Sequence, residues 1–130
     1  MHPTVRIHLW LEDDDAMVFG YGRVMLLDKI EECGSLRKAA TSMGMSYQAA
    51  WKKLRATESA LGVELVSRPQ CKSDGMSLTK EGLMIRNAFK HWYSAVENCA
   101  MAQAEKIFPW HLRCYSKNEH NKKIKNKSNL

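Results

Sequence analysis

The amino-acid sequence predicts a mainly α fold with small β elements, and three observations indicate it. Apolar and polar residues alternate over residues 5–11, and the hydrophobic pattern then changes to a helical period from residue 22. Single glycines separate three short helical segments between residues 22 and 62. A longer helical periodicity then covers residues 79–108 and predicts one long amphipathic helix.

Composition excludes several classes of protein. The 130 residues, of which 45% are hydrophobic and 26% charged, suffice for one soluble domain and its tails. No apolar segment approaches the roughly 18 residues that span a bilayer, and no signal peptide is recognisable. The four cysteines are scattered without a CxxC pair, which favours reduced thiols over disulfides or a metal site. We therefore expect a cytoplasmic protein with no membrane segment, no metal and no cofactor.

An N-terminal β-hairpin is the first predicted element. The alternation over residues 5–11 is typical of a half-buried strand, and residues 17–19 are expected to return as a short second strand. The acidic residues 12–15 lie between them. Consecutive aspartates lack the alternating ligand spacing of a calcium loop, so we interpret this segment as a solvated hairpin tip.

Three short helices are predicted next, each marked by local signals. Gly34 can supply the left-handed residue that ends the first helix. Ser35 is a good N-cap for the second helix, which ends at Gly44, and Ser46 caps the third, which ends at Gly62. Two helices joined by about three residues that include glycine must cross steeply. This arrangement predicts a helix-turn-helix, whose second helix presents its N-terminal residues to the major groove of DNA.

The outer face of the third helix indicates a nucleic-acid partner. Its apolar face begins at Ala50 and ends at Leu61, so basic and aromatic side chains are expected to point outward. Glutamine can pair with adenine through two hydrogen bonds, and lysine and arginine can reach guanine or phosphate. An unrelated helical bundle with the same spacing is the alternative. The DNA-binding residues predicted in these two helices are Ser35, Arg37, Ser46, Tyr47, Gln48, Trp51, Lys52 and Arg55.

Positive charge is centred on the same stretch of the chain. The net charge is +6, and residues 35–68 carry +4 through six Lys/Arg against two Glu. Residues 1–20 carry −3, and residues 109–130 carry +5. A local basic cluster suggests a polyanionic partner, although a solvated helix face would give the same count.

A second hairpin is predicted after the third helix. Residues 63–68 are expected to form a strand, residues 69–75 a loop, and residues 76–79 the returning strand. A hairpin in this position is the wing of a winged helix-turn-helix domain, which usually lies along a phosphate backbone. Its basic residues Arg68 and Lys72 complete the predicted DNA-binding set.

The long helix is predicted to join two copies of the chain. Thr79 caps it, and Glu81 lies in its first turn, where the helix dipole favours an acid. Its apolar surface exceeds what a small domain can cover, so we expect the excess to pack on the same helix of a second copy. A helix buried only in its own domain is the alternative. The predicted dimer-interface residues are Ile85, Phe89, Trp92, Val96 and Cys99.

These elements place the DNA-binding domain, with its dimerisation helix at 79–108, in residues 1–108. Residues 109–130 are rich in Asn and Lys, the composition of a disordered basic tail. His111 and Cys114 are two candidate ligands that do not make a metal site. No His, Asp or Cys has catalytic spacing, so we expect no catalytic residues and no enzyme.

Two segments resemble a known family. "GRVMLLDKIEECGSLRKAATSMGMSYQAAWKKLRATESALGVELVSR" (residues 22–68) and "LTKEG" (residues 78–82) resemble the N-terminal DNA-binding domain of ModE-type molybdate-responsive regulators. "ELVSR" and "LTKEG" are also similar to the winged helix of LysR-type regulators. The separate molybdate-binding domain of ModE-type regulators has no counterpart after residue 109, so we expect no response to molybdate.

The resemblance implies a sequence-specific transcriptional regulator. Such a protein would be a homodimer that reads an inverted repeat in double-stranded DNA with its helix at residues 46–61. Two alternatives use the same fold. One is a nonspecific or architectural DNA-binding protein, and the other is a winged-helix module that binds proteins.

Overall fold

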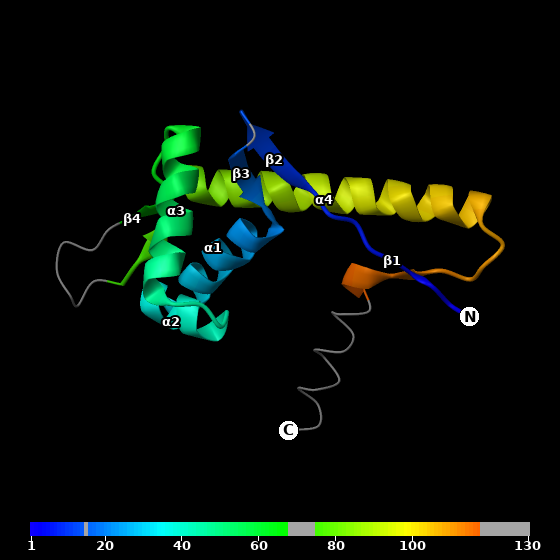
Figure 1. The fold of residues 1–130 in the computed structure, drawn as a ribbon, viewed down its shortest axis with the longest axis horizontal. Helices are drawn as coiled ribbons and strands as arrows, with labels where there is room; N and C mark the ends of the chain where they lie inside the picture. The colour runs from blue at the N-terminus through cyan, green and yellow to red at the C-terminus, as the bar shows by residue number, and fades with distance from the viewer. Residues whose placement is uncertain (15, 68–74, 118–130) are drawn as a thin grey trace, which may run out of the picture. The chain divides into compact units, whose positions relative to one another are not determined.

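The computed structural model describes residues 1–14, 16–67 and 75–117. The predicted mainly α fold with small β elements is confirmed (Figure 1). Two compact units make up the described chain, Leu9–His91 on the one hand and Met1–His8 with the chain from Trp92 onward on the other. The elements are β1 (Thr4–Val5), β2 (Trp10–Asp13), β3 (Ala16–Gly20), α1 (Tyr21–Cys33), α2 (Leu36–Ser42), α3 (Tyr47–Leu61), β4 (Val66–Ser67), β5 (Ser77–Leu78), α4 (Lys80–Ile107) and β6 (Arg113–Cys114).

The hydrophobic core of the Leu9–His91 unit gathers one face from each of its helices and both of its hairpins. Burial of each large apolar side chain contributes about 1.5–3 kcal/mol to stability. Together these contacts hold α3 in a fixed orientation within the unit. The largest fully buried apolar side chains are Phe19, Val24, Leu26, Leu27, Ile30, Leu54, Leu65 and Val66.

The predicted ends of the first and third helices are confirmed, and both predicted hairpins are present with different bounds. Gly34 and Gly62 follow α1 and α3 with a φ of 70° each. β2 and β3 pair antiparallel as the N-terminal hairpin, and β4 and β5 pair antiparallel as the base of the wing. The predicted wing loop, with Arg68 and Lys72, lies outside the described residues.

The N-terminal hairpin differs from the prediction in its bounds. Residues 6–9 are not strand, and β2 instead runs from Trp10 through the acidic residues to Asp13. The turn lies at Asp14, which has a φ of 47°. A register shift follows Leu11, which is 48% exposed instead of facing inward. The chain's first strand, β1, pairs with β6, whereas β2 pairs with β3.

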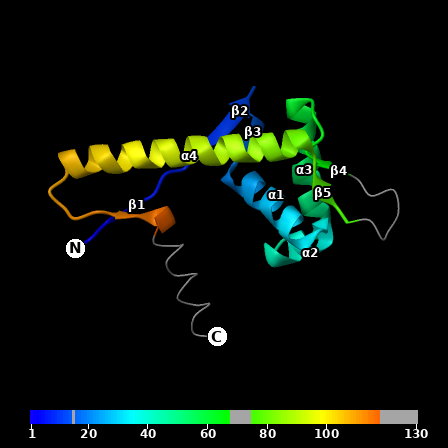
Figure 2. The ribbon, with the colours of Figure 1, turned by 180° about the vertical axis from the view of Figure 1, so that it is seen from behind.

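The start of α4 is fixed against the wing. The hydroxyl of Thr79 accepts a hydrogen bond from the backbone N–H of Gly82 (3.0 Å), which confirms Thr79 as the N-cap. A Cβ at Gly82 would lie 2.1 Å from the carbonyl oxygen of Leu65, a distance that no real Cβ contact allows. Glycine at this position therefore lets α4 touch the segment that leads into β4, and β4 and β5 lie beside its first turns (Figure 2).

Phe89 corrects the predicted dimer stripe. Its side chain is 4% exposed and packs edge-to-face on Phe19, with the ring centroids 5.5 Å apart. Phe89 therefore belongs to the core of its own domain, because α4 turns this position toward β3. The periodicity of α4 cannot distinguish this buried side from a side that faces a partner.

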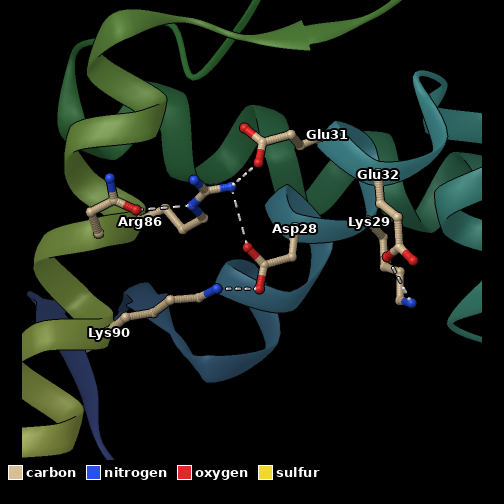
Figure 3. A network of polar contacts seen from close by, with 7 residues as sticks. Asp28, Lys29, Glu31, Glu32, Arg86 and Lys90 are labelled. Atoms are coloured by element: carbon tan, nitrogen blue, oxygen red, sulfur yellow. Dashed lines mark hydrogen bonds and ion pairs between the residues drawn. The ribbon is translucent and has the colours of Figure 1, made fainter.

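Ion pairs connect the first half of α4 to α1 (Figure 3). Arg86 Nη1 lies 2.8 Å from a carboxylate oxygen of Glu31 and 3.4 Å from one of Asp28. The second carboxylate oxygen of Asp28 lies 2.8 Å from Lys90 Nζ. The side chain of Arg86 is only 12% exposed, so this network is screened less by solvent than an ordinary surface pair.

Part of the predicted tail has regular structure in the second unit. β1 and β6 pair in parallel, with Val5 opposite Cys114. Ser116 donates a 2.7 Å hydrogen bond to the buried carboxylate of Glu97. The prediction of a disordered tail from residue 109 is therefore wrong for its first residues, because they pair with a strand from the other end of the chain. Residues 118–130, with most of the tail lysines, lie outside the described residues.

We expect Arg86→Met to lower the free energy of unfolding by about 1–2 kcal/mol, because Asp28 and Glu31 lose the cation that they share. Urea denaturation followed by circular dichroism measures this change. Lys29→Met is the matched control, since it removes an exposed ion pair with Glu32 within α1 and should change stability by less than about 0.5 kcal/mol. Equal losses in the two variants would contradict the special role of Arg86.

Candidate nucleic-acid interface

The orientation of α3 follows from its cap and its buried face. Ser46 accepts a 3.1 Å hydrogen bond from the backbone N–H of Ala49, which satisfies one of the free donors at the helix start. Ala50, Leu54 and Thr57 are buried as predicted, whereas Leu61 is half-buried. The opposite face of α3 is therefore directed outward.

Small side chains set the contact between α2 and α3. Ala39 and Ala40 of α2 and Ala50 of α3 are 0–1% exposed, so the two helix backbones can approach closely. Ser35 caps α2 by accepting a 3.1 Å hydrogen bond from the backbone N–H of Lys38. The two serines in the predicted DNA-binding set thus each have a structural role at the start of a helix.

Four predicted DNA-binding residues are connected by successive cation–π and edge-to-face contacts, and we call them the aromatic row: Arg37, Tyr47, Trp51 and Arg55. The Arg37 guanidinium lies 4.6 Å from the ring centroid of Tyr47. The rings of Tyr47 and Trp51 meet edge to face at 6.2 Å, and the Arg55 guanidinium lies 5.6 Å from the Trp51 ring. Each cation–π contact contributes about 0.5–1 kcal/mol at an exposed site.

The aromatic row connects the two helices of the motif. Arg37 belongs to the first turn of α2, and the other three residues recur once per turn along α3. Gln48 and Lys52 are exposed and one turn apart on α3, beside the row. The fold therefore brings these six predicted residues to one surface, at the start of the second helix of the motif.

Two polar residues that sequence reasoning missed, the half-buried Arg23 of α1 and the buried Glu58 of α3, hold α3 from its inner side. Arg23 Nε of α1 donates a 3.2 Å hydrogen bond to the Thr57 hydroxyl, and burial lowers the pKa of the Arg23 guanidinium. Glu58 is 8% exposed and accepts a 2.7 Å hydrogen bond from the backbone N–H of Leu65. A buried carboxylate that binds a backbone N–H fixes the end of α3 against the wing. In the sequence, only the position of Glu58 between apolar neighbours on the same face of α3 indicates that this carboxylate is buried.

A metal-binding cluster and a membrane-spanning helix are both absent from the described part of the chain. Within residues 1–14, 16–67 and 75–117, no three His, Cys, Asp or Glu side chains are grouped so that they could hold a metal ion. In the same residues, none of the helices combines the length and apolar character needed to cross a membrane.

One family model matches the part of the chain that contains the three short helices and the wing. Residues 22–83 match the family model of the bacterial regulatory helix-turn-helix protein, lysR family. No curated protein sequence matches the chain significantly.

Several solved structures share the fold. The CbnR_DBD–DNA complex is similar at 18% identity and a TM-score of 0.56, with 69% of this chain and 100% of that chain covered. The BenM_DBD/benA site 1 DNA complex matches at 18% identity and a TM-score of 0.55, covering 70% and 99%. CbnR, described as a LysR family transcriptional regulator, matches at 21% identity and a TM-score of 0.52, covering 66% and 29%.

These matches decide between the two resemblances. At such identities the solved structures show the fold, the winged helix-turn-helix, and the aligned region spans only 29% of the CbnR regulator chain. The family match supports the LysR-like resemblance and gives no support to the ModE-type one. Residues 22–83, just under half of the chain, therefore resemble the helix-turn-helix domain of the lysR family of bacterial regulatory proteins.

Proposed function

We propose that this protein is a sequence-specific transcriptional regulator that places α3 in the major groove of double-stranded DNA. The observation that carries the proposal is the exposed surface at the start of α3, where Gln48 and Lys52 stand beside the aromatic row. The CbnR and BenM domains that share this fold are bound to DNA in their structures, which supports the same partner here.

Each side chain has a role that its chemistry suits. Gln48 can make two hydrogen bonds to an adenine edge, and Lys52 can reach guanine or phosphate. Arg37 and Arg55 are cations held in place by ring stacking, which suits contacts to the DNA backbone. We assign Arg68 and Lys72 of the wing to phosphate contacts from the sequence alone.

We further propose that the protein acts as a homodimer joined through α4. Trp92 is 36% exposed, Cys99 is exposed, and Ile85 and Val96 are half-buried. Two copies related by a twofold axis present two recognition helices to half-sites about 34 Å apart, which requires an inverted repeat. We place the regulator in the cytoplasm, where bacterial DNA lies.

Replacing Gln48 with Ala should remove a contact to one base pair. The proposal predicts a loss of about 1–3 kcal/mol of discrimination at that position, with binding to random DNA unchanged. The measurement compares the affinities of wild type and variant for an operator, selected from random DNA, and for its single-base variants.

Lys53→Ala is the control for Gln48→Ala, because Lys53 is exposed on α3 but outside the predicted set. It should keep wild-type discrimination at every base pair. If Gln48→Ala also keeps it, the assignment of this face to base reading is wrong. If no operator can be selected, the proposal of sequence-specific binding is wrong.

Charged residues on the proposed dimer face should separate the subunits. We expect Trp92→Glu combined with Cys99→Glu to sediment as a monomer and to bind an inverted repeat at least tenfold more weakly, because two carboxylates would be buried. Circular dichroism checks that the variant folds. Ser94→Glu with Asn98→Glu, two exposed positions on other sides of α4, should remain dimeric. A wild-type protein that is monomeric at micromolar concentration would contradict the proposal.

A further inference from the structure

The aromatic row places two rings at the part of α3 that would meet base edges. Tyr47 is the first residue of α3 and is 37% exposed, and Trp51 follows one turn later and is half-buried. Their rings meet edge to face, with an interplanar angle of 90°. This arrangement places two aromatic rings on a helix face whose other exposed residues, such as Gln48 and Lys52, are polar.

Base edges in the major groove offer one apolar partner for such a surface. Adenine, guanine and cytosine present hydrogen-bond donors and acceptors there, whereas thymine also presents its C5 methyl group. An aromatic ring gains little from a donor or acceptor at its edge but excludes water around a methyl group. The chemistry of the two rings therefore favours thymine over the other bases.

The two flanking arginines pack against the rings and restrict their positions. Arg37 lies over the Tyr47 ring and Arg55 over the Trp51 ring, so each ring has a cation against it. A side chain that is ordered before binding loses less conformational entropy when DNA arrives. The row therefore presents rings whose positions are set in the free protein.

Gln48 lies beside the rings, and its chemistry also favours an A·T base pair. Glutamine in the major groove pairs best with adenine, and every adenine is paired with a thymine whose methyl group points into the same groove. A single A·T-rich step could therefore satisfy Gln48 and the adjacent rings together.

We propose that Tyr47 and Trp51 recognise the C5 methyl groups of thymines in each operator half-site. This inference rests on the proposed placement of α3 in the major groove. It makes the two aromatic residues determinants of specificity for A·T pairs.

The test replaces each thymine of the selected operator, one at a time, by deoxyuridine, which removes the methyl group and keeps every hydrogen-bonding atom. At one or two positions per half-site, full-length wild-type protein should bind the deoxyuridine operator about fourfold more weakly than the thymine operator. This is the loss expected when one methyl group is no longer there to be buried. Each of the variants Tyr47→Ala and Trp51→Ala should bind the thymine and deoxyuridine operators equally well at the position whose methyl group the missing ring contacts. Lys53→Ala should keep the wild-type ratio.

The outcomes separate this inference from the proposed function. If a defined operator is selected but contains no thymine in its half-sites, or tolerates deoxyuridine at every position, the methyl recognition is wrong and the regulator remains. The same follows if both ring variants keep the wild-type preference for thymine. If no operator is selected at all, the proposed function and this inference fail together. The wild-type measurement needs no variant, so tolerance of deoxyuridine at every position overturns the inference even where a ring variant does not fold.

Discussion

The close packing of α2 on α3 is the constraint on which the rest of the domain depends. Ala39, Ala40 and Ala50 are 0–1% exposed, so a larger side chain at any of these positions would have to be buried among its neighbours. Overfilling such a site typically costs about 1–3 kcal/mol and displaces the elements that meet there. Because the buried face of α3, which includes Ala50, is directed inward, the opposite face directs its polar and aromatic side chains outward. The same approach brings Arg37 of α2 over the ring of Tyr47, so one packing contact builds the surface that we assign to DNA.

Specific contacts also fix the inner side of α3 and the start of α4. Thr57 and Glu58 connect α3 to Arg23 of α1 and to the backbone at Leu65, and Gly82 brings α4 against that same residue. These contacts lie within one unit of the structure, and each involves a polar or glycine residue whose replacement leaves an unmet hydrogen bond or a clash. The first turns of α4 are thereby fixed relative to α3.

The sequence predicts the elements whose signals are local. The serine caps, the glycine ends and the 3.6-residue period determine α1 to α3, and the outer face of α3 follows once its buried face is known. The parts that could not be predicted depend on distant partners. β1 and β6 are two residues long and lie more than a hundred residues apart, so neither has a pattern of its own. Phe89 shares the apolar period of α4 with residues that stay accessible, and only its contact with Phe19 shows that it belongs to the core.

The central claim is that the outer face of α3 lies in the major groove, and methylation of bound DNA tests it most directly. Dimethyl sulfate modifies guanine at N7, which lies in the major groove, and adenine at N3, which lies in the minor groove. The account predicts that the full-length protein protects the guanine N7 positions that lie within each half-site of a selected operator. Protection confined to adenine N3, with every guanine N7 in the site still reactive, would contradict it.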